Sequence, residues 1–141
     1  MHPQAILSEC VVEPELRHEI LHHSQVFSPD QGRVLFHQGD TAEFLYFVNS
    51  GEVILTMRSE GKDILEMRAG SGSLLGLPAV VGSQPYSMTA KAVSGAEVFQ
   101  LSVYAFNELI KNEPRMSLAV LRILASEIRS ARQVITKAIR T

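Results

Sequence analysis

The chain has 141 residues, of which 45% are hydrophobic and 20% are charged. This composition is typical of one globular domain and excludes a mainly disordered or collagen-like chain. A single cysteine, Cys10, excludes an internal disulfide and a four-cysteine metal or iron–sulfur site. The chain contains no apolar run of the ~18 residues that a membrane helix needs, and its first residues do not resemble a secretory signal. We therefore expect a cytoplasmic protein that does not enter a membrane.

The net charge of -2 is unevenly distributed along the chain. Residues 115–141 contain six basic residues and only one acidic residue, Glu127. A basic segment of this kind can contact a phosphate backbone. The alternative, which we favour, is the solvated face of a helix.

The pattern of residues 1–102 predicts a short helix followed by a β-barrel. Pro14, Leu16 and Ile20 suit a helix over residues 14–24. Short runs rich in β-branched and aromatic residues follow, with glycines between them, which indicates an antiparallel sandwich or barrel. The predicted strands are residues 33–37, 44–49, 52–58, 62–68, 86–93 and 96–102, with hairpin turns at 49–51 and 59–61.

After residue 102 the spacing of apolar residues becomes helical again. It predicts a short helix over residues 103–111, a break at Pro114 and a long helix over residues 115–139. The layout is therefore an N-terminal segment with a short helix (1–25), a β-barrel (26–102), and a short helix followed by a long one (103–141).

The long helix has apolar residues on two faces, so it needs two partners. Val120, Ile123 and Val134 can pack on the barrel. The other face has the steps of three and four that are typical of a heptad seam: Leu121, Leu124, Ile128, Ala131, Ile135 and Ala138. We interpret this seam as the interface of a parallel homodimer. The alternative is a helix that docks entirely on its own barrel.

Several motifs occur in a characteristic order. They are Gly32-x6-Gly39-Asp40, Tyr46-Phe47-Val48-x2-Gly51-Glu52-Val53, Gly70-x-Gly72 before Leu75-Gly76, and Phe106-x2-Leu109 with Pro114 before a long helix. This order resembles the cyclic-nucleotide-binding domain of the Crp/Fnr family of bacterial transcription regulators. The resemblance implies a mainly β fold with flanking helices: a double-stranded β-helix, or jelly-roll β-roll, followed by a long dimerisation helix.

The resemblance also locates the segment that binds a cyclic nucleotide in this family. A cyclic phosphate needs converging backbone N–H groups and a cationic fork such as Arg, and the family adds a Glu for the ribose. Gly76 and Ser87 match the family pattern, but Leu77 stands at the Glu position and Tyr86 at the Arg position. Each loss removes a charge-assisted hydrogen bond, which lowers affinity roughly 10- to 150-fold. In addition, Ala131 and Arg132 stand where cyclic-AMP-binding members place hydroxyl side chains.

We therefore expect a regulatory, non-enzymatic sensor domain with a degenerate cyclic-nucleotide segment and no cofactor. Its pocket would hold a less charged small-molecule effector or be filled by its own side chains. The residues expected to line it are Leu75, Gly76, Leu77, Tyr86, Ser87 and Met88. A true cyclic AMP or cyclic GMP binder with a rearranged segment, in which Lys91 replaces the missing cation, is the alternative in the same fold.

The sequence also contains residues that could serve zinc or haem chemistry. His18-Glu19-x-x-His22 matches the H-E-x-x-H pattern of zinc hydrolases, in which two His bind zinc and the Glu acts as base, but no third ligand stands out. Haem would need an axial ligand from His2, His18, His22, His23, His37 or Cys10, and no motif selects one. The chain shows no pair of recognition helices, so we expect DNA contact only through a domain absent from these residues.

Overall fold

The computed structural model describes residues 4–6, 12–27 and 33–126. Its helices are α1 (Pro14–His23), α2 (Leu77–Gly82) and α3 (Val103–Asn112), followed by a helical segment over residues 115–126. Its strands are β1 (Gln4–Ile6), β2 (Gln25–Val26), β3 (Val34–Phe36), β4 (Phe44–Ser50), β5 (Val53–Ser59), β6 (Lys62–Ala69), β7 (Leu74–Leu75), β8 (Thr89–Ala92) and β9 (Glu97–Ser102).

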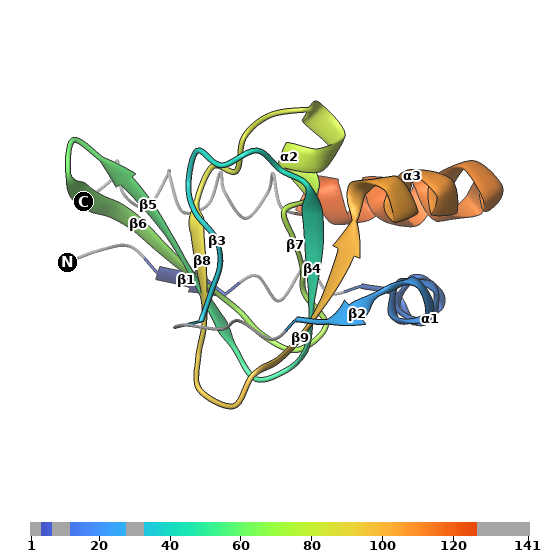
Figure 1. Ribbon diagram of the computed structural model, residues 1–141, viewed down its shortest axis with the longest axis horizontal. Coiled ribbons are helices and arrows are strands. Elements are labelled where there is room, and N and C mark those ends of the chain that lie inside the picture. The colour runs from blue at the N-terminus through green and yellow to red at the C-terminus, as the bar shows by residue number, and fades with distance from the viewer. Residues whose placement is uncertain (1–3, 7–11, 28–32, 127–141) are drawn as a thin grey trace.

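Two sheets face each other and enclose the barrel (Figure 1). One has the strand order β1-β6-β5-β8-β3, and the other has the order β2-β9-β4-β7. All pairings are antiparallel except that of β1 with β6. The predicted jelly-roll β-roll with flanking helices is therefore confirmed.

The two predicted hairpin turns connect β4 to β5 and β5 to β6. Gly51 has φ +85°, and a Cβ at this position would lie 2.6 Å from the Cα of Ala96. Only glycine fits such a close approach of two backbones. The second turn places Glu60 and Gly61 at φ 54° and 77°.

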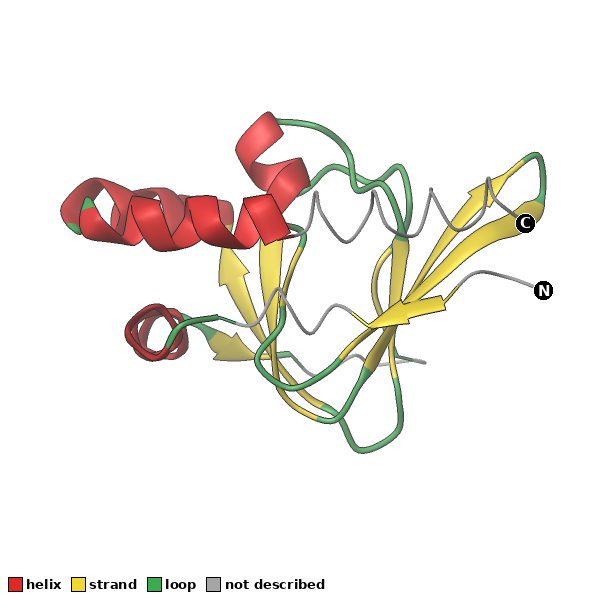
Figure 2. Cartoon of the chain, turned by 180° about the vertical axis from the view of Figure 1, so that it is seen from behind, coloured by secondary structure: helices red, strands yellow, loops and turns green. Residues whose placement is uncertain are grey.

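The helices lie together on the side of the barrel formed by β4, β7 and β9 (Figure 2). Each buries an apolar stripe against that sheet. The buried residues are Leu16 and Ile20 of α1, Phe106 and Leu109 of α3, and Met116, Ala119, Val120 and Ile123 of segment 115–126. The expectation that Val120 and Ile123 pack on the barrel is confirmed, whereas Val134 lies outside the described residues.

Polar contacts join segment 115–126 to the residue before α1, and α1 to the barrel. Arg122 donates to Glu13 at 2.8 Å, which connects segment 115–126 to the residue before α1. Arg17 of α1 donates to the side chain of Asn49 at 2.8 Å, and its guanidinium lies 5.4 Å from the centre of the Phe47 ring. The exposed Arg122–Glu13 pair adds little to stability, so the buried apolar stripe is the main attachment of the segment.

The sequence placed most elements to within one or two residues, but one strand begins later than predicted. Residues 86–93 were expected to be extended, whereas β8 covers only Thr89–Ala92. The backbone of Tyr86 instead bonds the loop after β3: its N–H donates to Asp40 O at 3.0 Å, and its carbonyl accepts from Gly39 N at 2.8 Å. His37 follows β3 rather than lying within it. Strands β1, β2 and β7 and helix α2 were not predicted.

The structure separates the two apolar faces of segment 115–126, and this gives a stability prediction. Ile123 is 3% exposed and Leu121 is 60% exposed. We expect Ile123→Ala to lower the free energy of unfolding by about 2–4 kcal/mol, because it leaves a cavity. The matched change Leu121→Ala should alter it by less than about 0.5 kcal/mol in dilute solution. Urea unfolding measures both, and equal effects would contradict this placement of the helix.

Candidate functional site

Gly76 forms the junction between β7 and α2 in a left-handed conformation, with φ +91°. A Cβ there would lie 3.0 Å from Cε1 of Tyr86 and 3.4 Å from the carbonyl oxygen of Phe44. The backbone angle favours glycine here, and any other residue would also push the Tyr86 ring away by a few tenths of an ångström. This contact brings together two of the residues that the sequence predicted for the site.

The Tyr86 side chain is almost fully enclosed, with 4% exposure. Its ring stacks on Phe36, with ring centres 3.8 Å apart and planes inclined by 20°. Its hydroxyl donates to the carbonyl oxygen of Phe44 at 2.5 Å and accepts from the Phe44 N–H at 3.3 Å. Stacking and hydrogen bonding together hold the side chain inside the barrel, at the position where the family pattern has an arginine.

Burial raises the pKa of Tyr86 from 10.0 to about 12. The hydrogen bond to the Phe44 backbone acts in the opposite direction, but the loss of solvation around the phenolate is the larger effect. Tyr86 is therefore neutral at physiological pH, and it carries a hydroxyl dipole and no positive charge.

Other aromatic side chains continue inward from Tyr86. Tyr46 lies 5.6 Å from Phe36 and 5.4 Å from Phe27, measured between ring centres. Its hydroxyl accepts from the Gln100 side chain at 3.3 Å, and burial raises its pKa. Phe44 lies 6.4 Å from Tyr46. We call Phe27, Phe36, Phe44, Tyr46 and Tyr86 the aromatic cluster.

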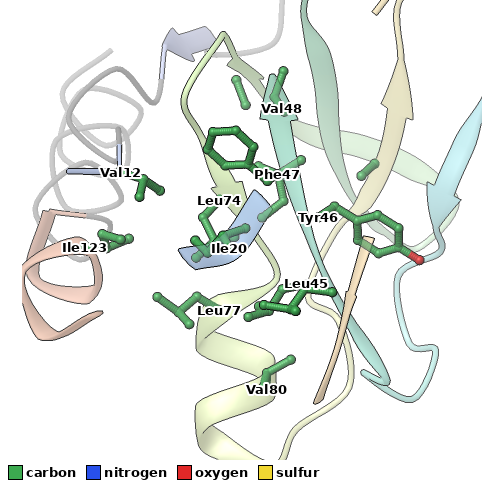
Figure 3. Close-up of a cluster of buried hydrophobic side chains, with 14 of the residues drawn as sticks. Val12, Ile20, Leu45, Tyr46, Phe47, Val48, Leu74, Leu77, Val80 and Ile123 are labelled. Carbon is green, nitrogen blue, oxygen red and sulfur yellow. The ribbon is translucent and has the colours of Figure 1, made fainter. Parts of the chain in front are cut away.

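Leu77 is fully buried, but it does not belong to this cluster. Figure 3 shows its side chain beside Leu45 and Ile20, whereas Tyr46 extends from the opposite side of β4. Leu77 therefore packs α2 against the helix-covered face of the sheet. A carboxylate at this position, as in the family pattern, would need a different placement of the side chain, because it would be costly to bury there.

The remaining predicted site residues lie around this centre with different exposures. Leu75 is buried in β7, Met88 is half-buried and Ser87 is exposed. Lys91, the possible substitute cation, is exposed on β8, whose neighbours Ala90 and Ala92 are buried. The ligand-binding role of the predicted set stays a prediction.

The zinc pattern lies on α1, at the surface. His18 and His22 are exposed. Glu19 faces His23 at 3.6 Å rather than pairing with either predicted ligand. Among the described residues, no group of three or more His, Cys, Asp or Glu side chains could hold a metal. Cys10 and His2 lie outside the described residues.

Two features of the site could not be read from the sequence. Phe36 and Phe44, which hold the Tyr86 side chain, come from other strands and were not in the predicted set. Phe36 lies opposite Ala90 across β3 and β8, and this pairing depends on a register shift that the sequence pattern does not specify. The Tyr86 hydroxyl bonds only the backbone of Phe44, so the identity of the Phe44 side chain could not indicate this contact.

Residues 28–113 match the family described as the cyclic nucleotide-binding domain, and the chain belongs to this family. The catabolite activator protein of Thermus thermophilus has a similar structure, with a TM-score of 0.74 and 28% identity over 89% of this chain and 60% of that one. A cyclic nucleotide-binding domain from Methylobacillus flagellatus has a TM-score of 0.72 and 23% identity, over 89% of this chain and 71% of that one. The resemblance to Crp/Fnr-type domains is thus confirmed.

Relatives found by sequence are much larger proteins. Lysophospholipase NTE1 of Chaetomium globosum is 29% identical over 70% of this chain but only 7% of its own length. A putative potassium channel protein of Rhodopseudomonas palustris is 30% identical over 67% of this chain and 23% of its own length. The chain therefore spans a small part of these relatives, and the part that matches the lysophospholipase is the cyclic nucleotide-binding domain alone.

The enclosure of Tyr86 gives a prediction for stability and its pH dependence. Tyr86→Phe keeps the ring but leaves the Phe44 carbonyl without its donor, so we expect a loss of about 1–2 kcal/mol at about pH 8. A raised pKa stabilises the fold below the unfolded value of 10.0, and this contribution is lost as pH rises toward about 12.

Urea unfolding at about pH 8 and about pH 11 measures both effects. The natural protein should lose more stability between these pH values than Tyr86→Phe does. Tyr104, which is 76% exposed, provides the matched control Tyr104→Phe, and it should leave stability unchanged. If the two phenylalanine variants behave alike, Tyr86 is not held as described.

Proposed function

We propose that this domain is a regulatory, non-enzymatic module in which the cyclic-nucleotide segment has lost its ligand and Tyr86 occupies the site. One observation carries the proposal: the Tyr86 hydroxyl is engaged with both backbone groups of Phe44, while its ring is stacked on Phe36. A side chain bound in this way closes the space next to Gly76. A cyclic nucleotide would have to displace it.

The charges of the described residues support the same proposal. A cyclic phosphate is held in this family by an Arg, and an uncharged Tyr86 cannot replace it. Arg58 is paired with Asp63 at 3.1 Å, and Arg68 is paired with Glu52 at 2.8 Å. Lys91 lies exposed on β8. None of these three cations is positioned by a described contact toward Gly76.

Calorimetric titration with cyclic AMP and cyclic GMP tests this proposal. We expect no saturable binding at up to about 1 mM ligand, because the cationic and ribose-binding partners are both replaced. Tyr86→Arg restores the family cation at this position, and Tyr104→Arg adds the same charge at an exposed site as a control. Micromolar binding by the natural protein would contradict the proposal.

A second candidate is a true cyclic-nucleotide-binding domain with a rearranged segment. Membership of the family over residues 28–113 favours it. The same titration separates the two, and Lys91→Gln would then test whether Lys91 is the substitute cation. Binding that survives Lys91→Gln would exclude that role.

We further propose that the domain acts as a cytoplasmic homodimer through residues 115–139, without a cofactor. Leu121 of the predicted seam is 60% exposed, Leu118 beside it is 55% exposed, and Leu124 is partly buried against the core. Exposed leucines in adjacent turns form an apolar face with no described partner on the barrel. The described residues do not include the other seam residues, which are Ile128, Ala131, Ile135 and Ala138. Arg132 and Cys10 also lie outside them.

Sedimentation at micromolar protein concentration tests the dimer. We expect a dimer that Leu121→Arg weakens at least tenfold, because it places a charge within an apolar contact. Tyr104→Arg on α3 is the control and should leave the association unchanged. A natural protein that sediments as a monomer would contradict the proposal.

The regulatory role agrees with the setting of the domain in its relatives. The Thermus thermophilus relative is by its name an activator, and the Rhodopseudomonas palustris relative is by its name a putative potassium channel.

The helices of the described residues are too short or too polar to span a membrane. We infer that any enzyme or DNA-binding activity would belong to other domains, and that a small-molecule effector or a protein partner acts on this one.

A further inference from the structure

The start of β4 is completed by a side chain rather than by a strand. On one side, Phe44 lies opposite Ser102 of β9. On the other side, within the described chain, β7 pairs with Tyr46 and Phe47 and ends before it reaches Phe44. The Tyr86 hydroxyl takes the place of the strand: it accepts from the Phe44 N–H at 3.3 Å and donates to the Phe44 carbonyl at 2.5 Å. One hydroxyl can do both, because it has a donor and two acceptor lone pairs.

The peptide group between Glu43 and Phe44 is hydrogen-bonded at both of its ends. Its N–H donates to the Tyr86 hydroxyl at 3.3 Å, and its carbonyl accepts from the Val103 N–H at 3.0 Å. A peptide group is planar, so its N–H and C=O move together. In the low-dielectric interior, hydrogen bonds in such a chain also polarise one another. A change at Tyr86 therefore reaches Val103 through a single rigid group.

Val103 is the first residue of α3. The residue before it, Ser102, caps this helix, because its hydroxyl accepts from the Ala105 N–H at 3.0 Å. Figure 1 shows α2 and the start of α3 at the same end of the barrel. The bond from Val103 to Glu43 thus ties the first turn of α3 to the strand that holds the Tyr86 side chain.

We infer that the Glu43–Phe44 peptide group couples the site at Tyr86 to the start of α3. An event that displaces the Tyr86 hydroxyl frees the Phe44 N–H, releases the peptide group and loosens its bond to Val103. The inference rests on the proposed regulatory function, and it assigns the route from the site to the helices. Because α3 leads into segment 115–126, a change in its first turn reaches the segment in which the predicted seam begins.

Amide hydrogen exchange in the natural chain and in Tyr86→Phe tests the inference. Exchange at Phe44 should become about tenfold faster, because its N–H loses its acceptor. Exchange at Val103 should become about threefold faster, although its own hydrogen-bond partner is unchanged. Both factors are taken relative to the amides of β5, which pairs with strands on both sides and reports the stability of the whole domain.

Tyr46→Phe is the matched control. Tyr46 is also a buried tyrosine and lies on β4, but its hydroxyl accepts from the side chain of Gln100 at 3.3 Å rather than from a backbone group. Removing that hydroxyl should leave exchange at Val103 unchanged relative to β5. The comparison separates coupling through the peptide group from a general loss of stability.

Val103→Pro tests the coupling in the opposite direction. It removes the N–H that bonds Glu43, and proline suits the first position of a helix. Ser102 already has the extended conformation that precedes a proline, with ψ 152°. The substitution therefore removes one hydrogen bond and keeps the start of α3.

In Val103→Pro, two amides on the far side of the peptide group report the effect. These are Phe44 and Gly39, whose N–H donates to the Tyr86 carbonyl at 2.8 Å. We expect exchange at both to become about threefold faster relative to β5, since coupling is reciprocal. Val103→Ala keeps the N–H and should leave both amides unchanged relative to β5.

Three results would overturn the inference. They are exchange at Val103 that only follows β5 in Tyr86→Phe, an equal effect of Tyr46→Phe, or a folded Val103→Pro variant in which Phe44 and Gly39 are unchanged. If Val103→Pro does not fold, the comparison of the two tyrosine variants still decides. No nucleotide is present in these measurements, so their outcome is separate from that of the calorimetric titration.

Discussion

The structure of the site depends on how the Tyr86 side chain is held. Its hydroxyl bonds the backbone of Phe44 and its ring stacks on Phe36, so one residue joins β4, β3 and the loop that enters β8. Gly76 allows this arrangement, because a side chain there would meet the ring. The segment that contains Gly76 and Tyr86 is thereby built into the core of this domain.

The two replaced positions have different physical consequences. Tyr86 puts an aromatic ring inside the barrel, whereas Leu77 puts an aliphatic side chain on the other face of β4, against Leu45 and Ile20 (Figure 3). Tyr86 fills the space beside Gly76, and Leu77 packs α2 against the helix-covered face. Both side chains make apolar contacts that are present without a ligand.

Much of this organisation could be predicted from the sequence, because it depends on local patterns. Short runs of β-branched and aromatic residues, with glycine turns between them, located most of the barrel, and helical spacing located α1 and α3. The short elements β2, β7 and α2 were missed, since two to six residues carry too little periodicity. The late start of β8 and the position of the Leu77 side chain depend on tertiary contacts. The first follows from a backbone bond from Tyr86 to Asp40, and the second from the packing of α2. The spacing of residues in the sequence predicts that Leu77 and Tyr86 lie close to the site. It does not predict that α2 places Leu77 on the other face of β4.

If the proposal is right, Tyr86 remains engaged whether or not a cyclic nucleotide is present. Amide hydrogen exchange of Gly39, Phe44 and Tyr86 reports on this engagement, because each of these N–H groups bonds another part of the site. We expect slow exchange at all three amides, unchanged by about 1 mM cyclic AMP or cyclic GMP. Fast exchange at these amides, or a change at them when either nucleotide is added, would contradict it.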